Sequence, residues 1–313
     1  MLTRKKFIQK TKEIFEKAFF SFTLLPLFMK YVQANDASAF DIVALQGGKG
    51  PDELFREGMK HLGGMQRFVK KGQKVLVKPN IGWDRSPEYG ANTSPELVGA
   101  IVKECLNVGA SEVYVFDHTC DPWKNCYKNS KIEEYAKNNG AKVVPADSKD
   151  YYVEKEIPRG KTLKEAHIHK LFLECDVIIN VPVLKHHSSG TITGALKNHM
   201  GVVWNRGLWH LKDLHQCIAD FATFRKPDLN ILDAWRVMVK NGPRGRDISD
   251  AITYKYLFIS TDPVAIDSAG AAVLARANTT IGKAEDIRHI RLAREYGLGR
   301  TDLDKMNIKR ITL

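Results

Sequence analysis

A continuous apolar run rich in Val and Ile occupies residues 177–183 and is broken mainly by Asn180. A strand with one face in water alternates apolar and polar residues, whereas a short β-branched run without alternation is typical of a strand covered on both faces. Strands of this kind belong to sheets with helices packed on each side. The run therefore predicts a buried strand in an α/β protein.

Further segments share this strand character, and helical patterns fall between many of them. The other predicted strands are residues 42–45, 74–78, 112–116, 142–144, 230–232 and 256–260. Helices are predicted after Ser94 and Asp262, because each is a capping residue followed by a proline. Thr162 and Glu165 have the spacing of a capping box and predict another helix start. This alternation predicts an α/β fold with a mostly parallel sheet and helices on both faces.

Cations and imidazoles gather directly after the run at 177–183. Within fifteen positions, with Gly, Ser and Thr between them, lie Lys185, His186, His187, Lys197, Asn198 and His199. Open α/β sheets bind ligands beyond the carboxyl ends of their strands. Such side chains suit a phosphate or carboxylate, and histidine adds proton transfer or metal ligation. We therefore predict a site for a small anionic ligand; the alternative is a solvated polar loop.

Roles within this site follow from side-chain chemistry. The predicted catalytic residues are His187, Lys197 and His199, because an imidazole is matched to acid–base work near neutral pH. A metal, if bound, is predicted to be held by His186, His187 and His199. The predicted substrate-binding residues are Lys78, Asn80, Lys185, Asn198, Arg244 and Asp267.

Some of these residues have a second interpretation that the sequence leaves open. Lys78 and Asn80 follow a predicted strand, either lining the site at its carboxyl end or forming a simple turn. Arg244 either clamps an anion or lies in a surface turn. Asp267 either faces the site or stabilises a helix start. Downstream, Trp204, Trp209 and His210 either line the pocket, with Arg206 between them, or pack in the core.

Four short elements occur in a defined order along the chain. They are Lys78-Pro79-Asn80, P-x-L-K-x-H at residues 182–187, A-L-K-N-x-x-G at 195–201 and D-P-V-A-x-D at 262–267. In these elements the chain resembles the family of domain of unknown function 362, and the resemblance covers most of residues 41–313. Some relatives in that family carry an added ferredoxin-type iron–sulfur segment. This chain has no C-x-x-C or ferredoxin spacing, so no intrinsic iron–sulfur cluster is predicted.

The spacing of His187 and Lys197 is also similar to the site loop of nickel-pincer lactate racemases. In those enzymes a His is followed ten positions later by a Lys that carries the cofactor. The resemblance implies that Lys197 holds a cofactor or substrate and that His187 moves a proton. The racemases are considerably longer, and they have Gly-Gly where this chain has Gly194-Ala195-Leu196.

Charge adds a general constraint on partners. The net charge is +12, and residues 1–39 contribute seven Lys and Arg against three Asp and Glu, which leaves +8 for residues 40–313. This charge favours anionic partners. A nucleic acid is not expected, because no zinc finger or aromatic-flanked basic motif occurs. Two function classes remain: an enzyme acting on a small anionic substrate, or an accessory protein that captures an anion, a metal or a redox partner without turnover.

Residues 1–39 are predicted to be an export signal ahead of a single α/β domain at 40–313. Basic residues at Arg4, Lys5 and Lys6 precede a largely apolar stretch at 18–29, and small residues follow. Residues 3–8 resemble the twin-arginine motif, with Lys5 in place of the second arginine. We expect an exported, periplasmic or otherwise extracytoplasmic protein that meets the membrane only through this segment. An uncleaved anchor or interfacial helix is the alternative. An oxidising exterior would permit a disulfide between Cys120 and Cys126.

Overall fold

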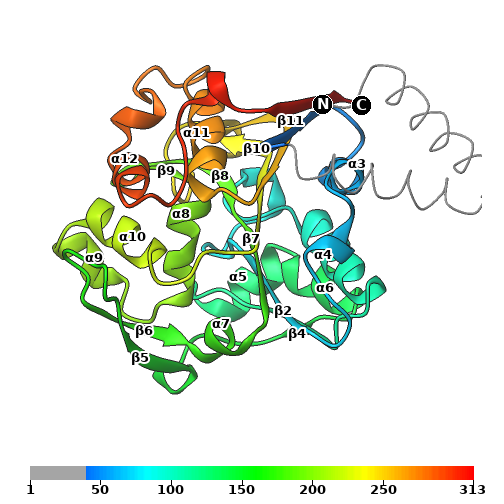
Figure 1. Ribbon diagram of the computed structural model, residues 1–313, viewed down its shortest axis with the longest axis horizontal. Helices are drawn as coiled ribbons and strands as arrows, with labels where there is room; N and C mark the ends of the chain where they lie inside the picture. Colours follow the sequence, from blue (N-terminus) through cyan, green and yellow to red (C-terminus); the bar gives the residue numbers. More distant parts are fainter. Residues whose placement is uncertain (1–39) are drawn as a thin grey trace, which may run out of the picture. The chain divides into compact units, whose positions relative to one another are not determined.

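The computed structural model describes residues 40–313, which are built around one large mixed sheet (Figure 1). The strand order along its main path is β12-β1-β11-β10-β7-β2-β3-β4. These strands are β1 (Ile42–Gln46), β2 (Lys74–Pro79), β3 (Glu112–Val115), β4 (Lys142–Val143), β7 (Val177–Val181), β10 (Leu229–Met238), β11 (Ala251–Ser260) and β12 (Ile308–Thr312). β4, β3, β2, β7 and β10 run parallel, so their carboxyl ends meet at one rim. β11 is antiparallel to both of its neighbours.

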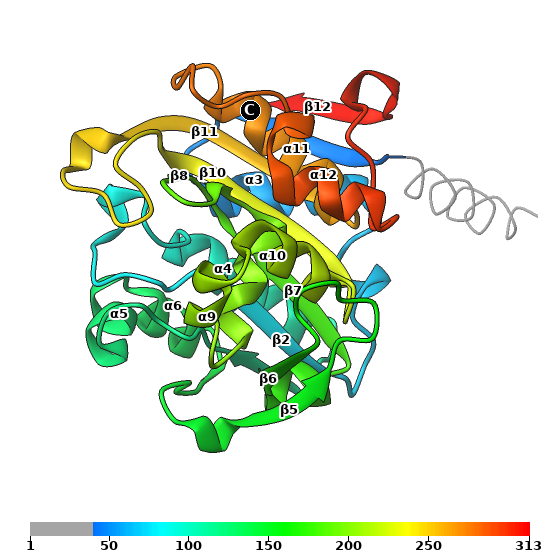
Figure 2. The same cartoon turned by 90° about the vertical axis from the view of Figure 1, so that its left-hand side faces the viewer.

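Helices cover both faces of the sheet (Figures 1 and 2). One apolar layer contains residues of α3 (Pro51–His61), α4 (Pro95–Asn107), α5 (Trp123–Asn129) and α6 (Ile132–Asn138). The opposite layer contains residues of α7 (Lys170–Glu174), α8 (Ala195–Asn198), α9 (Gly207–Leu211), α10 (Leu214–Ala222), α11 (Pro263–Leu274) and α12 (Arg288–Glu295). This arrangement confirms the predicted α/β fold with a mostly parallel sheet.

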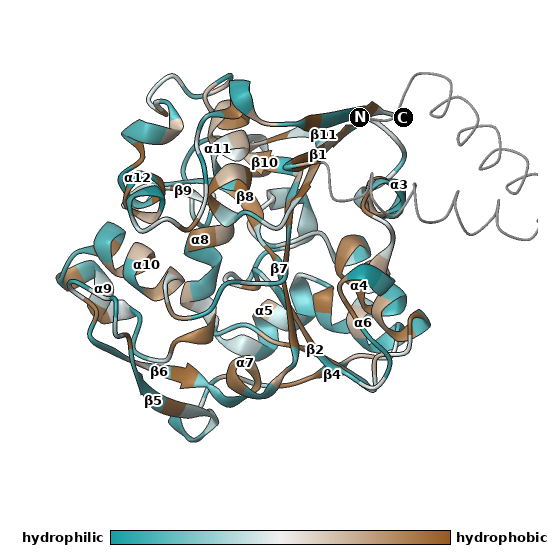
Figure 3. Ribbon diagram, in the orientation of Figure 1, coloured by the Kyte–Doolittle hydropathy of each residue, from teal (hydrophilic) through white to brown (hydrophobic). Residues whose placement is uncertain are grey.

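The central strands are buried on both sides, as their unbroken apolar sequences predicted. Val75 and Val77 of β2 pack into the layer with α4, while Leu76 between them packs into the opposite layer. Every residue of β7 is buried. Figure 3 shows both strands in the brown of apolar residues. Because neither face meets water, polar side chains can reach solvent only where these strands end.

The segment after β7 forms regular secondary structure rather than the solvated loop that the sequence left as an alternative. After Pro182 the chain continues as β8 (Val183–His187), which pairs with β10 and forms a hairpin with β9 (Thr191–Thr193). Residues 188–190 form the turn of this hairpin. α8 and a 3-10 turn, η4 (His199–Val202), follow directly. The site segment therefore stands on regular backbone at the rim of the sheet.

Two of the three predicted helix starts are confirmed. Pro95 opens α4 after Ser94, and Asp262 caps α11 by accepting the N–H groups of Val264 and Ala265. The helix predicted from Thr162 and Glu165 is wrong. Glu165 instead begins β6 (Glu165–His169), which pairs with β5 (Tyr152–Glu156) in a separate two-stranded sheet. Ala166 and Ile168 are buried on alternate positions, so the period of two prevails over the capping signal.

The predicted export signal falls on residues 1–39, which lie outside the described part of the chain. Between residues 40 and 313, no helix has both the length and the apolar character needed to span a membrane. Cys120 is exposed and Cys126 is buried, and both are free thiols rather than a disulfide.

Candidate functional site

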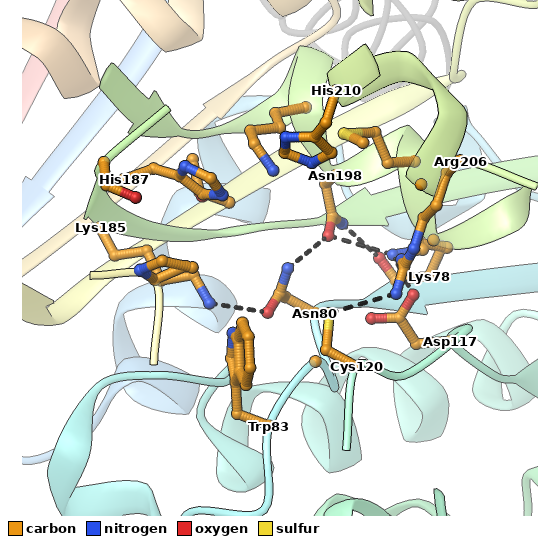
Figure 4. A pocket seen from close by; sticks show the side chains of 18 residues that line it. Lys78, Asn80, Trp83, Asp117, Cys120, Lys185, His187, Asn198, Arg206 and His210 are labelled. Carbon is orange, nitrogen blue, oxygen red and sulfur yellow. Dashed lines mark hydrogen bonds and ion pairs between the residues drawn. The ribbon is translucent and has the colours of Figure 1, made fainter. Parts of the chain in front are cut away.

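A cavity of about 420 Å³ opens at the rim where β2 and β3 end, beside the β8–β9 hairpin. Four of its lining side chains are cationic, and Asp117 is the sole carboxylate among the described residues that line it. Figure 4 shows how these side chains converge from separate elements. The lining residues are Lys78, Asn80, Gly82, Trp83, Asp117, Cys120, Lys185, His187, Ser188, Thr193, Lys197, Asn198, Met200, Gly201, Arg206, Gly207, His210 and Pro243.

Four asparagine side chains form a hydrogen-bonded row that runs from the cavity into the core, which we call the asparagine ladder; Asn80 and Asn198 line the cavity, and the other two are buried. Asn80 donates to the Oδ1 of Asn198 at 3.1 Å, and Asn198 donates to that of Asn180 at 2.8 Å. Asn180 donates in turn to the Oδ1 of Asn230 at 3.0 Å. The parallel register places Asn180 of β7 beside Asn230 of β10, and buried amides require such partners. The ladder ties α8 to the ends of three strands.

Lys78 and Asp117 form a buried ion pair at the cavity wall. Their Nζ and Oδ1 atoms lie 2.8 Å apart, with each side chain at most 2% exposed. Lys78 also donates to the carbonyl of Pro79 at 2.8 Å and to Asn198 Oδ1 at 3.1 Å. A Cβ at Gly201 would lie 1.7 Å from Asp117 Oδ1, so only glycine leaves room for this pair. Burial lowers the pKa of Lys78, although Asp117 opposes the shift.

Among residues 40–313, Lys185 is held by neutral acceptors only. Its ammonium group donates to Asn80 Oδ1 at 3.1 Å and to the backbone carbonyl of Ala91. Burial, followed by the charge of Lys197, lowers the pKa of Lys185 to about 7. Because no carboxylate in the described part of the chain forms an ion pair with Lys185, its protonated form can bind an anion.

Lys197 has no hydrogen-bond or ion-pair partner for its ammonium group within residues 40–313, although it lines the cavity. Burial, followed by the charge of Arg206, lowers its pKa to about 8. A Cβ at Gly190 would lie 2.9 Å from Lys197 Cε and 3.5 Å from His187 Nδ1. Lys197 and His187 therefore flank the same glycine, so the structure brings this predicted pair together.

His187 is oriented by the hairpin turn. Its Nδ1 accepts the backbone N–H of Gly190 at 3.0 Å, which leaves the proton of the neutral ring on Nε2. Burial lowers the pKa of His187, and the charges of Lys197 and Lys185 lower it further. His187 is therefore a neutral hydrogen-bond donor at physiological pH rather than a cationic acid.

The other two predicted metal-binding histidines lie elsewhere. His186 points away from His187 along β8, and its Nδ1 accepts the N–H of Gly242 at 3.1 Å. His199 packs between Phe172 and Phe221, with ring centroids 6.0 and 6.3 Å away, and burial lowers its pKa to about 3.

These positions correct two predictions. His186, His187 and His199 do not meet, and no group of three or more His, Cys, Asp or Glu side chains in residues 40–313 is placed to hold a metal ion. The predicted three-histidine metal site is therefore not formed among the described residues. His199 is also no candidate for acid–base work, because it does not line the cavity.

Two predicted substrate-binding residues also lie outside the cavity. Arg244 forms an ion pair with Asp121 at 3.5 Å, and its side chain is 51% exposed. Asp267 is completely buried in α11 and accepts the N–H groups of Ala195 and Leu196 at the start of α8. Arg244 thus lies at the surface, and Asp267 supports the site from behind.

Several lining residues were missed or left open by the sequence. Arg206 donates to the carbonyl of Thr119 at 3.0 Å and to Cys120 Sγ at 3.3 Å. The Thr193 hydroxyl is buried and has no hydrogen-bond partner among the described residues, and Trp83 forms part of the cavity wall. The sequence did point to Arg206 and His210, because both follow closely after the predicted site residues. No sequence pattern placed Trp83 and Cys120 at the cavity. They lie in the loops after β2 and β3, and only folding brings them close to the other lining residues.

Comparisons with known proteins define the class. Residues 75–272 match the family described as a domain of unknown function, DUF362. The chain belongs to this family, as the ordered motifs indicated. It is also 25% identical over 232 residues to the thylakoid-associated protein sll1697 of Synechocystis sp., covering 69% of this chain and 71% of that protein.

Two solved structures resemble the chain more distantly. A protein from Thermotoga maritima shares 12% identity at a TM-score of 0.41, covering 80% of this chain. The lactate racemase apoprotein from Thermoanaerobacterium thermosaccharolyticum shares 11% identity at a TM-score of 0.42, covering 73% of this chain. The chain spans 60% and 55% of the lengths of these two proteins.

Proposed function

We propose that the protein is an enzyme that acts on a small anionic substrate in the cavity beside the β8–β9 hairpin. The observation that carries this proposal is the excess of positive charge there. The sole lining carboxylate in residues 40–313, Asp117, is paired with Lys78, and no carboxylate forms an ion pair with Lys185, Lys197 or Arg206. An anionic ligand would supply the missing counter-charge.

The lining side chains divide into two groups under this proposal. Lys185 and Arg206 bind the anionic group of the substrate, and the guanidinium of Arg206 offers the planar geometry that suits a carboxylate. Lys197 and His187 act on the reacting atoms. His187, with its proton on Nε2, donates a hydrogen bond to an oxygen on which negative charge develops.

Anion binding is tested by calorimetry with oxalate at pH 6, 7, 8 and 9. Lys185 and Lys197 have pKa values of about 7 and about 8. The protonated forms bind the anion, so the affinity should be highest at pH 6 and fall as the pH rises through both values.

Lys197→Met should weaken binding at pH 6 about tenfold, the effect of losing one charged contact. Lys212→Met, a change at an exposed lysine that does not line the cavity, is the matched control. Equal affinities at pH 6 and pH 9, or no binding at any pH, would contradict an anion site.

Turnover is tested separately, because capture without reaction is the rival function. The protein is incubated in D2O with a set of 2-hydroxy and 2-oxo acids, and each sample is followed by proton NMR for deuterium incorporation or new products. His187→Ala should abolish deuterium incorporation and product formation. Its oxalate affinity should stay within about threefold of wild type, because the imidazole ring acts on the reacting atoms. Oxalate binding with no turnover of any compound would favour an accessory protein.

A further inference from the structure

We infer that the substrate carries an aldehyde or ketone group beside its anionic group, as a 2-oxo acid does, and that Lys197 forms an imine with this carbonyl carbon. The inference rests on the proposed function and adds to it a chemical class of substrate and a covalent step. The contacts of the three cavity lysines are its basis.

The three lysines differ in how their ammonium groups are held. Lys78 is bound by Asp117, the Pro79 carbonyl and Asn198, and Lys185 is bound by Asn80 and the Ala91 carbonyl. Within residues 40–313, only the ammonium group of Lys197 lacks such a partner among the three. The Lys197 side chain is partly exposed and lines the cavity. Lys197 is the one whose nitrogen is free to bond to a ligand atom.

The surroundings of Lys197 also favour the reactive, neutral amine. A protonated lysine has no lone pair, and the ordinary pKa of about 10.4 leaves little neutral amine at pH 7. Burial and the charge of Arg206 lower the pKa of Lys197 to about 8, so a substantial part of it is neutral in a slightly alkaline buffer. Burial with adjacent cations is the general means by which proteins activate a lysine for attack on a carbonyl.

The step balances with groups that line the cavity. The lone pair of Lys197 Nζ attacks the carbonyl carbon, and the C=O π bond breaks toward oxygen. One proton of the amine nitrogen passes to that oxygen to give a carbinolamine, and the second proton of the nitrogen leaves with the hydroxyl group as water, which gives the neutral imine. One water is released, and no oxidant or reductant is needed. His187, across Gly190 from Lys197, donates its Nε2–H hydrogen bond to the oxygen as charge develops there.

The position of the remaining cations explains why the carbonyl compound would be anionic. Arg206 and Lys185 line the same cavity as Lys197 and have no carboxylate partner within the described residues. Figure 4 shows them on opposite sides of Asn80, so an anionic group can be held beside the reacting amine from either side. A neutral aldehyde would leave these charges unmatched.

Borohydride trapping tests the imine, with pyruvate as the probe. Wild-type protein is mixed with pyruvate at pH 8, sodium borohydride is added, and intact and peptide masses are measured. We expect one reduced adduct per chain, located on Lys197. Lys197→Arg should lose the adduct and keep oxalate affinity within about threefold, since the charge remains. Lys212→Arg, outside the cavity, should form the adduct as wild type does.

The outcomes separate this inference from the proposed function. Oxalate and pyruvate binding without an adduct on Lys197 would overturn the imine and leave the anion site intact. An adduct of equal yield in Lys197→Arg would place the chemistry on another lysine and also overturn it. Absence of any anion binding would remove the proposed function itself. If Lys197→Arg does not fold, as judged by circular dichroism, suppression of the wild-type adduct by excess oxalate provides the same test.

Discussion

Asp117 neutralises the charge of Lys78, which is buried inside the protein. Both it and Lys78 are buried, and the ion pair between them joins the ends of β2 and β3. A buried pair adds little stability over apolar packing, yet removing one partner leaves an uncompensated charge and costs about 3–5 kcal/mol. We therefore predict that Asp117→Asn lowers the free energy of unfolding by about 3 kcal/mol at pH 7.

The loss in Asp117→Asn should depend on pH with a defined sign. The folded pKa of Lys78 is lowered, so the cost of its charge is present at low pH and disappears as the pH approaches the unfolded value near 10.4. The difference in unfolding free energy between wild type and Asp117→Asn should shrink as the pH rises, by at most about 1.4 kcal/mol per pH unit. Urea unfolding of wild type and Asp117→Asn at pH 7 and pH 9 measures this difference in free energy. Glu133→Gln, which removes a half-exposed ion pair with Lys137, should cost under about 1 kcal/mol at both values.

Single residues also show where sequence-based prediction ends. Lys185, His186 and His187 are consecutive on β8, so the middle side chain must face the opposite side from its neighbours. No strand was predicted over residues 184–187, so this alternation was not considered and His186 was wrongly placed beside His187. Lys78, Asn80, Lys185, His187, Lys197 and Asn198 were all predicted and all line the cavity. The sequence was enough to predict which side chains have the chemistry of such a site. The direction in which each side chain points depends on the backbone conformation.

At the scale of elements, α8 is positioned by α11. Asp267 of α11 accepts the N–H groups of Ala195 and Leu196, and a Cβ at Gly194 would lie 2.2 Å from its Oδ1. Two buried donors would lose their acceptor in Asp267→Ala, a loss that typically costs about 1–3 kcal/mol. Because α8 carries Lys197 and Asn198, oxalate affinity should fall as well.

Asp267→Asn distinguishes positioning from a charge effect. Its side chain accepts one N–H group but presents an amide nitrogen to the other, so stability and affinity should lie between those of wild type and Asp267→Ala. Thermal unfolding and oxalate calorimetry at pH 8 measure both. If Asp267→Ala lowered stability without changing affinity, Asp267 would have no influence on the cavity.

The elements that sequence patterns missed share a physical cause. The buried runs of β2, β7 and the inner parts of β10 and β11 were recognised because both faces are apolar. β5, β6 and β12 are short and partly exposed, so their patterns are weak and pairing with another segment decides their structure. The antiparallel placement of β11 also depends on the whole sheet.

For the whole molecule, we propose that residues 1–39 direct export, which rests on their basic and apolar composition alone. Fusing this segment to a fluorescent protein in a bacterial host should place the reporter outside the cytoplasm. The double change Arg4→Gln and Lys5→Gln should keep the reporter inside the cytoplasm. The double change Lys10→Gln and Lys12→Gln removes the same charge and should still allow export. Retention of all three fusions in the cytoplasm would contradict the proposal.

The asparagine ladder has a consequence for how the cavity responds to its surroundings. Its amides, unlike the lysines above them, neither gain nor lose a proton across the biological pH range. Asn80 and Asn198, the two members of the ladder that line the cavity, thus keep one set of hydrogen bonds while the charge of the neighbouring lysines varies. A change in acidity would alter how strongly this protein attracts a ligand without altering the shape that the ligand must fit.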